Sequence, residues 1–184
     1  MTHEEIKHWL DDHNIENYTI RSDGVVNVDG RVDLSHIKEL TLPVQFGKVT
    51  GKFDVCSSFL TSLKGVPEIV VGDFNCGGTH ISSLEYAPQF VGGYFSCYNT
   101  YITSLSGVDK RIKQLNGTFY CVENATHLLG ILLIKGITDF EFSHRGGQCD
   151  VVVSQIINKY LGTGDILSAQ DELIDAGLVD QARL

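Results

Sequence analysis

Three cysteines recur at matching places along the chain, and thiols at a fixed spacing could bind a metal ion or form a redox pair. Cys76, Cys97 and Cys121 each stand two residues after a phenylalanine. If neighbouring strands run parallel and in register, the three thiols lie in a row and do not converge on a tetrahedral point. We therefore interpret them as small buried apolar side chains and expect no metal site. Cys56 directly follows an inward-facing valine, so it is predicted to be the more exposed thiol.

Other residues that could do chemistry lack the partners they would need. His3 and His8 are five residues apart, whereas two zinc ligands on one helix face stand four apart. The Gly-Thr-Gly sequence at 162–164 precedes a predicted helix, but it has neither the strand nor the lysine of a phosphate-binding loop. No nucleophile, base and acid can be combined from the sequence. We therefore expect no catalytic residue and no cofactor, and a protein that is not an enzyme.

The cysteines belong to a repeat that organises most of the chain. An apolar–x–apolar triplet recurs six times, and its first residues are separated by steps of 21, 21, 21, 24 and 21. The first residues are Val32, Phe53, Phe74, Phe95, Phe119 and Phe140. A leucine follows the end of a triplet eight residues later in the first five repeats. A fixed period of this size predicts a solenoid, in which each repeat forms one coil and stacks on the next.

The expected fold is an α/β repeat, a leucine-rich-repeat-like parallel β-solenoid of about six coils with helical caps at both ends. Residues 1–16 read as a capping helix in which Thr2 and Glu5 form a capping box. Residues 17–145 form the repeat solenoid, and residues 146–184 form a helical cap or, alternatively, a tail that docks a partner. The three extra residues between Phe95 and Phe119 predict a bulged corner. A second apolar column, at the same step of 21, is Val49, Val70, Val91 and Ile112.

Composition limits where the protein acts and what it binds. The net charge is -9, and no basic face appears that could replace phosphate counterions, so we expect no direct binding of nucleic acid. No apolar run approaches the roughly 18 residues of a membrane span, and the acidic start of the chain does not resemble a secretory signal. The five cysteines, an odd number, favour a reducing compartment. These features predict a cytoplasmic protein without a membrane partner.

The outward positions of the predicted strands carry a cluster of tyrosines surrounded by charged residues. Aromatic residues with a polar rim are typical of protein interfaces. Tyrosine is also common on strand surfaces in general, and it is the placement of three tyrosines in adjacent coils that favours an interface. The predicted partner-binding residues are Tyr94, Tyr98, Tyr120, Asp54, Asp73, Lys52, Asp139 and Glu141.

The repeats resemble a degenerate leucine-rich-repeat family that is abundant in tailed bacteriophages and some bacteria, with the pattern G-x-F-x-C-x-x-N-x-L-T-S-L-x-G-x-P-x-x-V. The resemblance covers residues 17–142 and is carried by segments such as Gly51-Lys52-Phe53 and Leu60-Thr61-Ser62-Leu63. The asparagine of that pattern is mostly replaced here, by Ser58, Thr79 and Thr100, and is kept at Asn124. The resemblance implies a solenoid that acts inside an infected bacterial cell, in host takeover or in blocking a defence system.

Three functions are compatible with the sequence. The first is a non-catalytic module, encoded by a phage, that binds a host or phage protein and inhibits it by steric occlusion. The second is an acidic decoy that occupies a nucleic-acid-binding groove and depends on Asp54, Asp73 and Glu141. The third is a small enzyme or ligand-binding protein with a pocket between the last coil and the C-terminal helices. A homodimer formed edge to edge also stays open.

Overall fold

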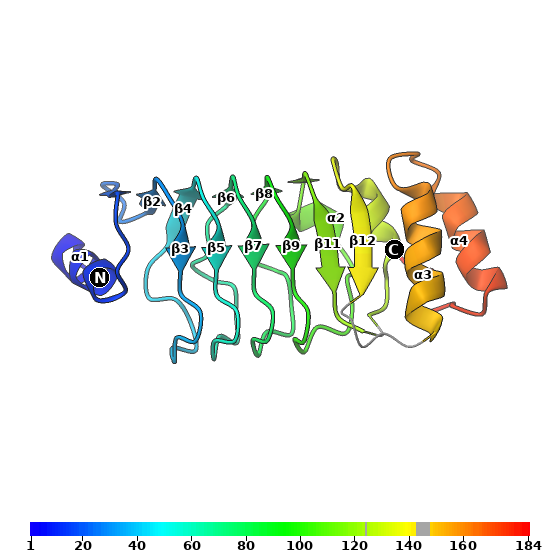
Figure 1. The fold of residues 1–184 in the computed structure, drawn as a ribbon, viewed down its shortest axis with the longest axis horizontal. Coiled ribbons are helices and arrows are strands. Elements are labelled where there is room, and N and C mark those ends of the chain that lie inside the picture. The colour runs from blue at the N-terminus through cyan, green and yellow to red at the C-terminus, as the bar shows by residue number, and fades with distance from the viewer. Residues whose placement is uncertain (124, 143–147) are drawn as a thin grey trace.

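The chain winds into a parallel β-solenoid in which two six-stranded sheets enclose a common core (Figure 1). The computed structural model describes residues 1–123, 125–142 and 148–184, and of residues 148 and 149 it describes only the backbone. Sheet A, in spatial order, consists of β1 (Tyr18–Ile20), β2 (Val26–Val28), β4 (Phe46–Val49), β6 (Ile69–Val70), β8 (Phe90–Val91) and β10 (Gln114–Leu115). Sheet B contains the triplets and consists of β3 (Val32–Asp33), β5 (Phe53–Asp54), β7 (Phe74–Asn75), β9 (Phe95–Ser96), β11 (Thr118–Cys121) and β12 (Asp139–Phe142). The predicted solenoid of about six coils is therefore confirmed.

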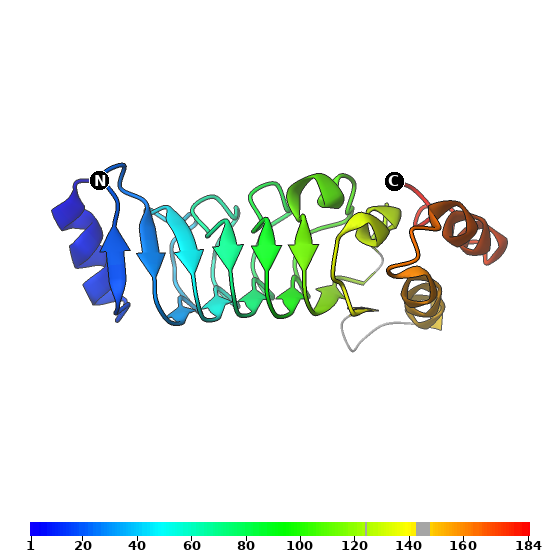
Figure 2. The same ribbon diagram turned by 90° about the horizontal axis from the view of Figure 1, so that it is seen from above.

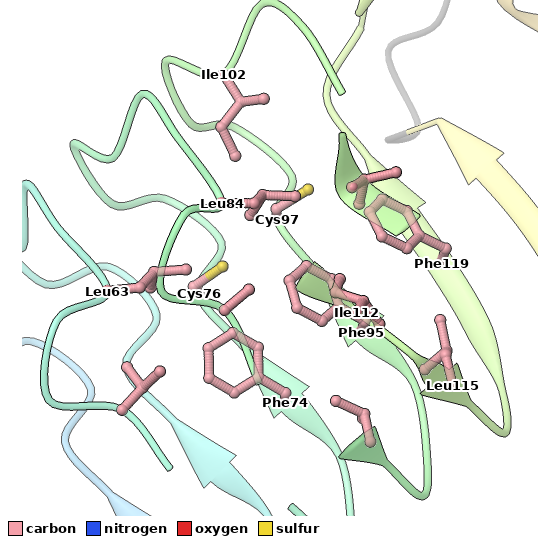
Figure 3. Packing of buried hydrophobic residues seen from close by; sticks show 14 of the residues in the cluster. Leu63, Phe74, Cys76, Leu84, Phe95, Cys97, Ile102, Ile112, Leu115 and Phe119 are labelled. Carbon is pink, nitrogen blue, oxygen red and sulfur yellow. The ribbon is translucent and has the colours of Figure 1, made fainter. Parts of the chain in front are cut away.

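The repeat spacing sets the register of sheet B. Phe53 pairs with Phe74, Phe74 with Phe95, and Phe95 with Phe119, always in parallel. The buried rings stack along the solenoid with centroid separations of 5.0 to 6.1 Å, as the sticks in Figure 3 show for three of them. Burying one such side chain stabilises a fold by about 1.5–3 kcal/mol. The phenylalanine column is therefore a main source of core stability.

Glycines allow successive coils to approach closely where the chain passes from sheet A to sheet B. Gly51, Gly72, Gly93 and Gly117 occupy the same place in successive coils, two residues before the triplet. A Cβ atom on Gly72 would lie 2.7 Å from the carbonyl carbon of Gly51, and one on Gly117 would lie 2.6 Å from the carbonyl oxygen of Gly93. Because these neighbours are backbone atoms, a side chain could be accommodated only if the coils moved apart.

A second column adopts left-handed backbone conformation just after the triplet. His36, Ser57, Gly78 and Asn99 have φ values of 64°, 54°, 70° and 50°. Glycine and asparagine tolerate this region, whereas other L-residues are strained in it by roughly 1–2 kcal/mol. The first two coils therefore carry conformational strain that the next two avoid.

The three-residue insertion, where a bulged corner was predicted, forms a helical turn. It falls in α2 (Val108–Arg111), which precedes β10. As a consequence, Val91 pairs with Leu115 and not with Ile112, which stood in the predicted column. Ile112 is nevertheless fully buried. The placement of Ile112 in the apolar column was wrong because the insertion lies between Val108 and β10. Leu115 therefore takes the place in the column that was predicted for Ile112.

The two ends of the solenoid are covered by helices (Figure 2). At one end lies α1 (His3–Asp12), whose predicted capping box between Thr2 and Glu5 is present. Leu10 of this helix is buried, and the Trp9 ring lies 6.4 Å from that of Phe46 in the first coils. At the other end lie η1 (Leu129–Leu133), α3 (Gln148–Tyr160) and α4 (Ile166–Asp175). No helix among the described residues is long and apolar enough to span a membrane.

The helix α3 also supplies a hydrogen-bonding partner for the last strand. The Asn158 side chain accepts a hydrogen bond from the Phe140 amide, with 2.7 Å between nitrogen and oxygen, and donates one of 3.0 Å to the Phe140 carbonyl. An amide side chain thus pairs with the edge of β12 as a further strand would. The C-terminal helices therefore act as a cap of the last coil, one of the two roles predicted for them.

Candidate functional site

A groove of about 990 Å³ opens over sheet B between β7 and β12. Its volume is at the upper end of the range typical of ligand sites, about 300–1,000 Å³. It is lined by Asn75, Tyr94, Ser96, Tyr98, Asn99, Thr100, Tyr101, Ile102, Thr103, Tyr120, Val122, Glu123, Glu141 and Phe142. We call this surface the tyrosine groove. The described lining contains no residue of α3 or α4.

The groove exists because small side chains occupy two successive coils. Asn75, Ser96, Tyr120 and Glu141 stand side by side in the register of sheet B. The side chains of Asn75 and Ser96 are buried and form the floor, whereas the longer side chains of Tyr120 and Glu141 rise beside it. A column of unequal side chains therefore produces a hollow in an otherwise regular sheet surface.

Each tyrosine of the groove is supported by a neighbour. The Tyr98 ring covers Gly77, where a Cβ atom would lie only 2.3 Å from a ring carbon. Tyr94 and Tyr120 meet edge to face, with 5.8 Å between ring centroids and an interplanar angle of 79°. Their orientation is therefore fixed by the fold. The three tyrosines that the sequence placed on one surface line the same groove.

Lys52 and Asp54 form an ion pair beside the groove. Their charged atoms are 2.7 Å apart, and the ammonium of Lys52 lies 5.9 Å from the centroid of the Tyr94 ring. The hydrogen bond with Asp54 raises the pKa of Lys52 well above its ordinary value. Burial opposes ionisation of Asp54, but hydrogen bonds from Lys52 and from the Cys56 amide outweigh it and lower the pKa of Asp54. Neither residue lines the groove itself.

The other predicted acidic residues make different contacts. Asp73 accepts a hydrogen bond of 3.0 Å from the Tyr94 amide of the next coil, and Asp139 accepts one of 2.9 Å from the Phe140 amide. Both carboxylates thus help to hold backbone. Glu141 is the single acidic residue of the predicted set that lines the groove, and the sequence interpretation missed Glu123.

The sequence interpretation also missed Tyr101, which is 64% exposed and lines the groove. Its ring stacks on His80, which in turn stacks on Phe59, with centroid separations of 5.7 and 5.8 Å. Phe59, His80 and Tyr101 are spaced by 21 residues, so the repeat itself carries the signal that would have found them. The aromatic surface therefore continues from the groove along the corner of three coils.

The cysteines form no metal centre in the part of the chain that the structure describes. Cys76, Cys97 and Cys121 are buried, as predicted, and burial raises the pKa of both Cys76 and Cys121. Figure 3 shows the sulfur atoms of Cys76 and Cys97 among leucine side chains of the core. Cys56 is only partly exposed, and burial together with Asp54 raises its pKa to about 11. No group of three histidine, cysteine or acidic residues among those described could hold a metal ion.

Comparison with known proteins finds no matching family model, no similar curated protein and no similar solved structure.

Proposed function

We propose that the protein is a non-catalytic protein-binding module whose partner docks in the tyrosine groove. The observation that carries this proposal is the gathering of Tyr94, Tyr98, Tyr101 and Tyr120 around one open groove. Tyrosine supplies a large contact area with few rotatable bonds, and binding hot spots are enriched in it. Because neighbouring residues already hold all four of these rings, little conformational entropy is lost when a partner binds.

The biological role that we propose is inhibition of a host or defence protein by steric occlusion, within the cytoplasm of an infected bacterium. The resemblance of the repeats to a family abundant in tailed bacteriophages supports this role. The net charge of -9 fits a basic partner, including a protein that handles nucleic acid.

An acidic decoy is less well supported by the contacts of its carboxylates. Asp54 is paired with Lys52, and Asp73 is hydrogen-bonded to the backbone of the next coil. A decoy must present its charges to the partner, and both of these are already engaged within the chain. The tyrosines are therefore the better candidates for the main contacts.

The proposal is tested with two groove residues that are well exposed, so that their replacement disturbs the core little. Tagged wild-type protein, the double variant Tyr98→Ser/Tyr101→Ser and the control Tyr86→Ser are used to capture proteins from a bacterial lysate at low and moderate salt. Tyr86 is 42% exposed, close to the 39% of Tyr98, and does not line the groove. Thermal unfolding of each variant checks that it is folded.

We expect a specific protein to be retained by the wild type and by Tyr86→Ser, and lost by the double variant. The captured protein is then purified, and its own activity is measured with and without the repeat protein to test occlusion. Retention of the same protein by the double variant would show that the groove is not the binding surface.

A further inference from the structure

We infer that the tyrosine groove receives a proline-rich segment of the partner in the polyproline II conformation. This inference rests on the proposed function, because it specifies the chemistry of the partner at that same groove. It follows from the direction in which the groove runs, from the uncharged groups that it offers, and from the tyrosine rings that line it.

The groove runs across the strands of sheet B. Its lining includes Asn75, Ser96, Tyr120 and Glu141, which stand side by side on four neighbouring strands. The backbone beneath it is already paired between coils, as where the Tyr120 carbonyl accepts a hydrogen bond of 3.0 Å from the Cys97 amide. A segment that lies in the groove therefore finds no strand with which its own backbone could pair. The polyproline II helix suits such a place, because it makes no backbone hydrogen bonds of its own and needs no ladder partner.

The length of the groove corresponds to a short peptide. The strands β7, β9, β11 and β12 are neighbours in sheet B, and neighbouring strands lie about 4.8 Å apart, so the groove extends over about 14 Å. A polyproline II helix rises about 3.1 Å per residue, so about four to five residues span this distance. A peptide of six prolines is therefore long enough to fill the groove.

The charges of the groove favour an uncharged occupant. Its described lining contains no lysine, arginine or histidine, and its two acidic residues, Glu123 and Glu141, already interact within the chain. Neither an acidic nor a basic group of a partner would therefore meet a free counter-ion there. A segment of proline brings no charge into the groove and needs none.

The polar groups that the groove does offer are hydroxyls and an amide. Tyr98, Tyr101 and Asn99 line it, and their side chains make no hydrogen bond to the residues that the structure describes. Tyrosine hydroxyls and the asparagine NH₂ group can all donate hydrogen bonds. A proline-rich segment has carbonyl acceptors but lacks N–H donors, so these donors match what its backbone can accept.

The rings supply the apolar part of the contact. Tyr98 has one face against Gly77, and Tyr101 has one face against His80, while both tyrosines remain 39% and 64% exposed. The accessible part of each ring includes the face opposite its support. Proline-rich segments dock in aromatic-lined grooves of this kind, and both the segment and these rings are ordered before they meet, which limits the entropy lost on binding.

The test uses three probes: blocked hexaproline, a blocked hexapeptide in which glycine alternates with serine, and maltohexaose. The glycine–serine peptide is flexible and lacks proline rings, and the glucose hexamer represents another class of ligand that stacks on aromatic rings. Binding to the full chain is measured by NMR titration, which also detects an upfield ring-current shift of proline protons over a tyrosine face. The variants are Tyr98→Leu and Tyr101→Leu, with Tyr86→Leu as a control outside the groove. Thermal unfolding checks that each variant is folded.

We expect hexaproline to bind with upfield-shifted proline protons, and the other two probes to bind more weakly. Tyr98→Leu and Tyr101→Leu should each weaken hexaproline binding by about 2- to 10-fold, the range for loss of one hydrogen bond, and should reduce the upfield shift. Tyr86→Leu should leave the affinity within about twofold, because the groove is unchanged.

The absence of hexaproline binding would overturn the inference, as would equally tight binding of the glycine–serine peptide. Unchanged affinity in both Tyr98→Leu and Tyr101→Leu would do so as well, and tighter binding of maltohexaose would assign the groove to a carbohydrate. The proposed function is judged separately, by whether the Tyr98→Ser/Tyr101→Ser variant loses its protein partner. A partner that is lost by that variant and yet binds without a proline-rich segment would leave the function standing and the inference wrong.

Discussion

Asn158 offers the clearest test of how the solenoid is terminated. Its side chain both accepts from and donates to the backbone of Phe140, over 2.7 and 3.0 Å. In Asn158→Ala the Phe140 carbonyl loses this donor, whereas the Phe140 amide keeps Asp139 as an acceptor at 2.9 Å. The carbonyl is therefore the group whose loss of a partner should dominate the effect.

The expected destabilisation follows from two opposing effects. Leaving a partly buried carbonyl without its hydrogen bond costs about 1–3 kcal/mol. Alanine favours the helical backbone of α3 over asparagine by about 0.5 kcal/mol, which offsets part of this loss. We therefore expect the free energy of unfolding to fall by about 1–2 kcal/mol in Asn158→Ala.

The assay is chemical denaturation, combined with hydrogen exchange of the Phe140 amide. Asn158→Asp is an informative second variant, because its carboxylate can still accept from the amide but cannot donate to the carbonyl. Gln155→Ala, at an exposed position of the same helix, is the control and should change stability little. If Asn158→Ala is as stable as Gln155→Ala, the side chain does not complete the edge of β12, and the capping argument fails.

Three further predictions concern the repeat itself. Ser57→Gly should raise the free energy of unfolding by about 1 kcal/mol, because Ser57 has a left-handed φ of 54°. Ser82→Gly is the control and should lower the free energy of unfolding slightly. The two variants are compared by urea denaturation. Gly72→Ala should destabilise by about 1–3 kcal/mol or more, since its Cβ atom would lie 2.7 Å from backbone of the preceding coil, and a melting temperature equal to that of the wild type would contradict this. The pKa of Asp54 is lowered in the folded state, so its ionised form stabilises the fold above the ordinary carboxyl pKa of about 4, and this contribution is lost as pH falls below that value. The stability difference between the wild type and Asp54→Asn should therefore shrink on acidification, and a difference that is constant with pH would show that the Lys52 pair is not its origin.

The period of the sequence was sufficient to predict the fold because stacking requires regularity. Residues 21 apart must occupy equivalent places in successive coils, so the register of Phe53, Phe74 and Phe95 followed directly. The prediction failed at Ile112 because an insertion can be placed anywhere within a coil without altering the spacing of the triplets on either side. Only the structure shows that the extra residues form α2, between Val108 and Leu115.

The hydroxyl residues at the asparagine position of the repeat show a different limit of prediction from the sequence. Thr79 and Thr100 each donate a hydrogen bond to the carbonyl three residues earlier, at 2.7 and 2.8 Å. The buried hydroxyl of Ser58 has no hydrogen-bond partner among the described residues, and Asn124 lies outside them. Residue types alone predicted a polar column but could not show which members satisfy their hydrogen bonds, because that depends on the rotamer.

The candidate site was predictable in its tyrosines but not in its shape. A sequence column shows which residues face outward, whereas a groove depends on the difference in size between neighbours, as between Ser96 and Tyr120. The sequence also predicted more acidic residues at the groove than line it, for a related reason. Asp54 and Asn75 each accept a hydrogen bond from the amide two residues later and so close the turn after their strand, a local role that is invisible in the spacing of the repeats.

The strands beneath the groove differ in length. β11 and β12 pair over four residues, from Thr118 with Asp139 to Cys121 with Phe142, whereas the earlier pairs of sheet B extend over two. Longer pairing, and the pairing of Asn158 with Phe140, hold these last strands more firmly than the rest. A binding surface on rigid strands loses less entropy when a partner docks. Tyr120 therefore lies on the part of the sheet that is best able to hold its ring in place, whereas Tyr94, Tyr98 and Tyr101 belong to the coil of β9 and depend on contacts with neighbouring residues.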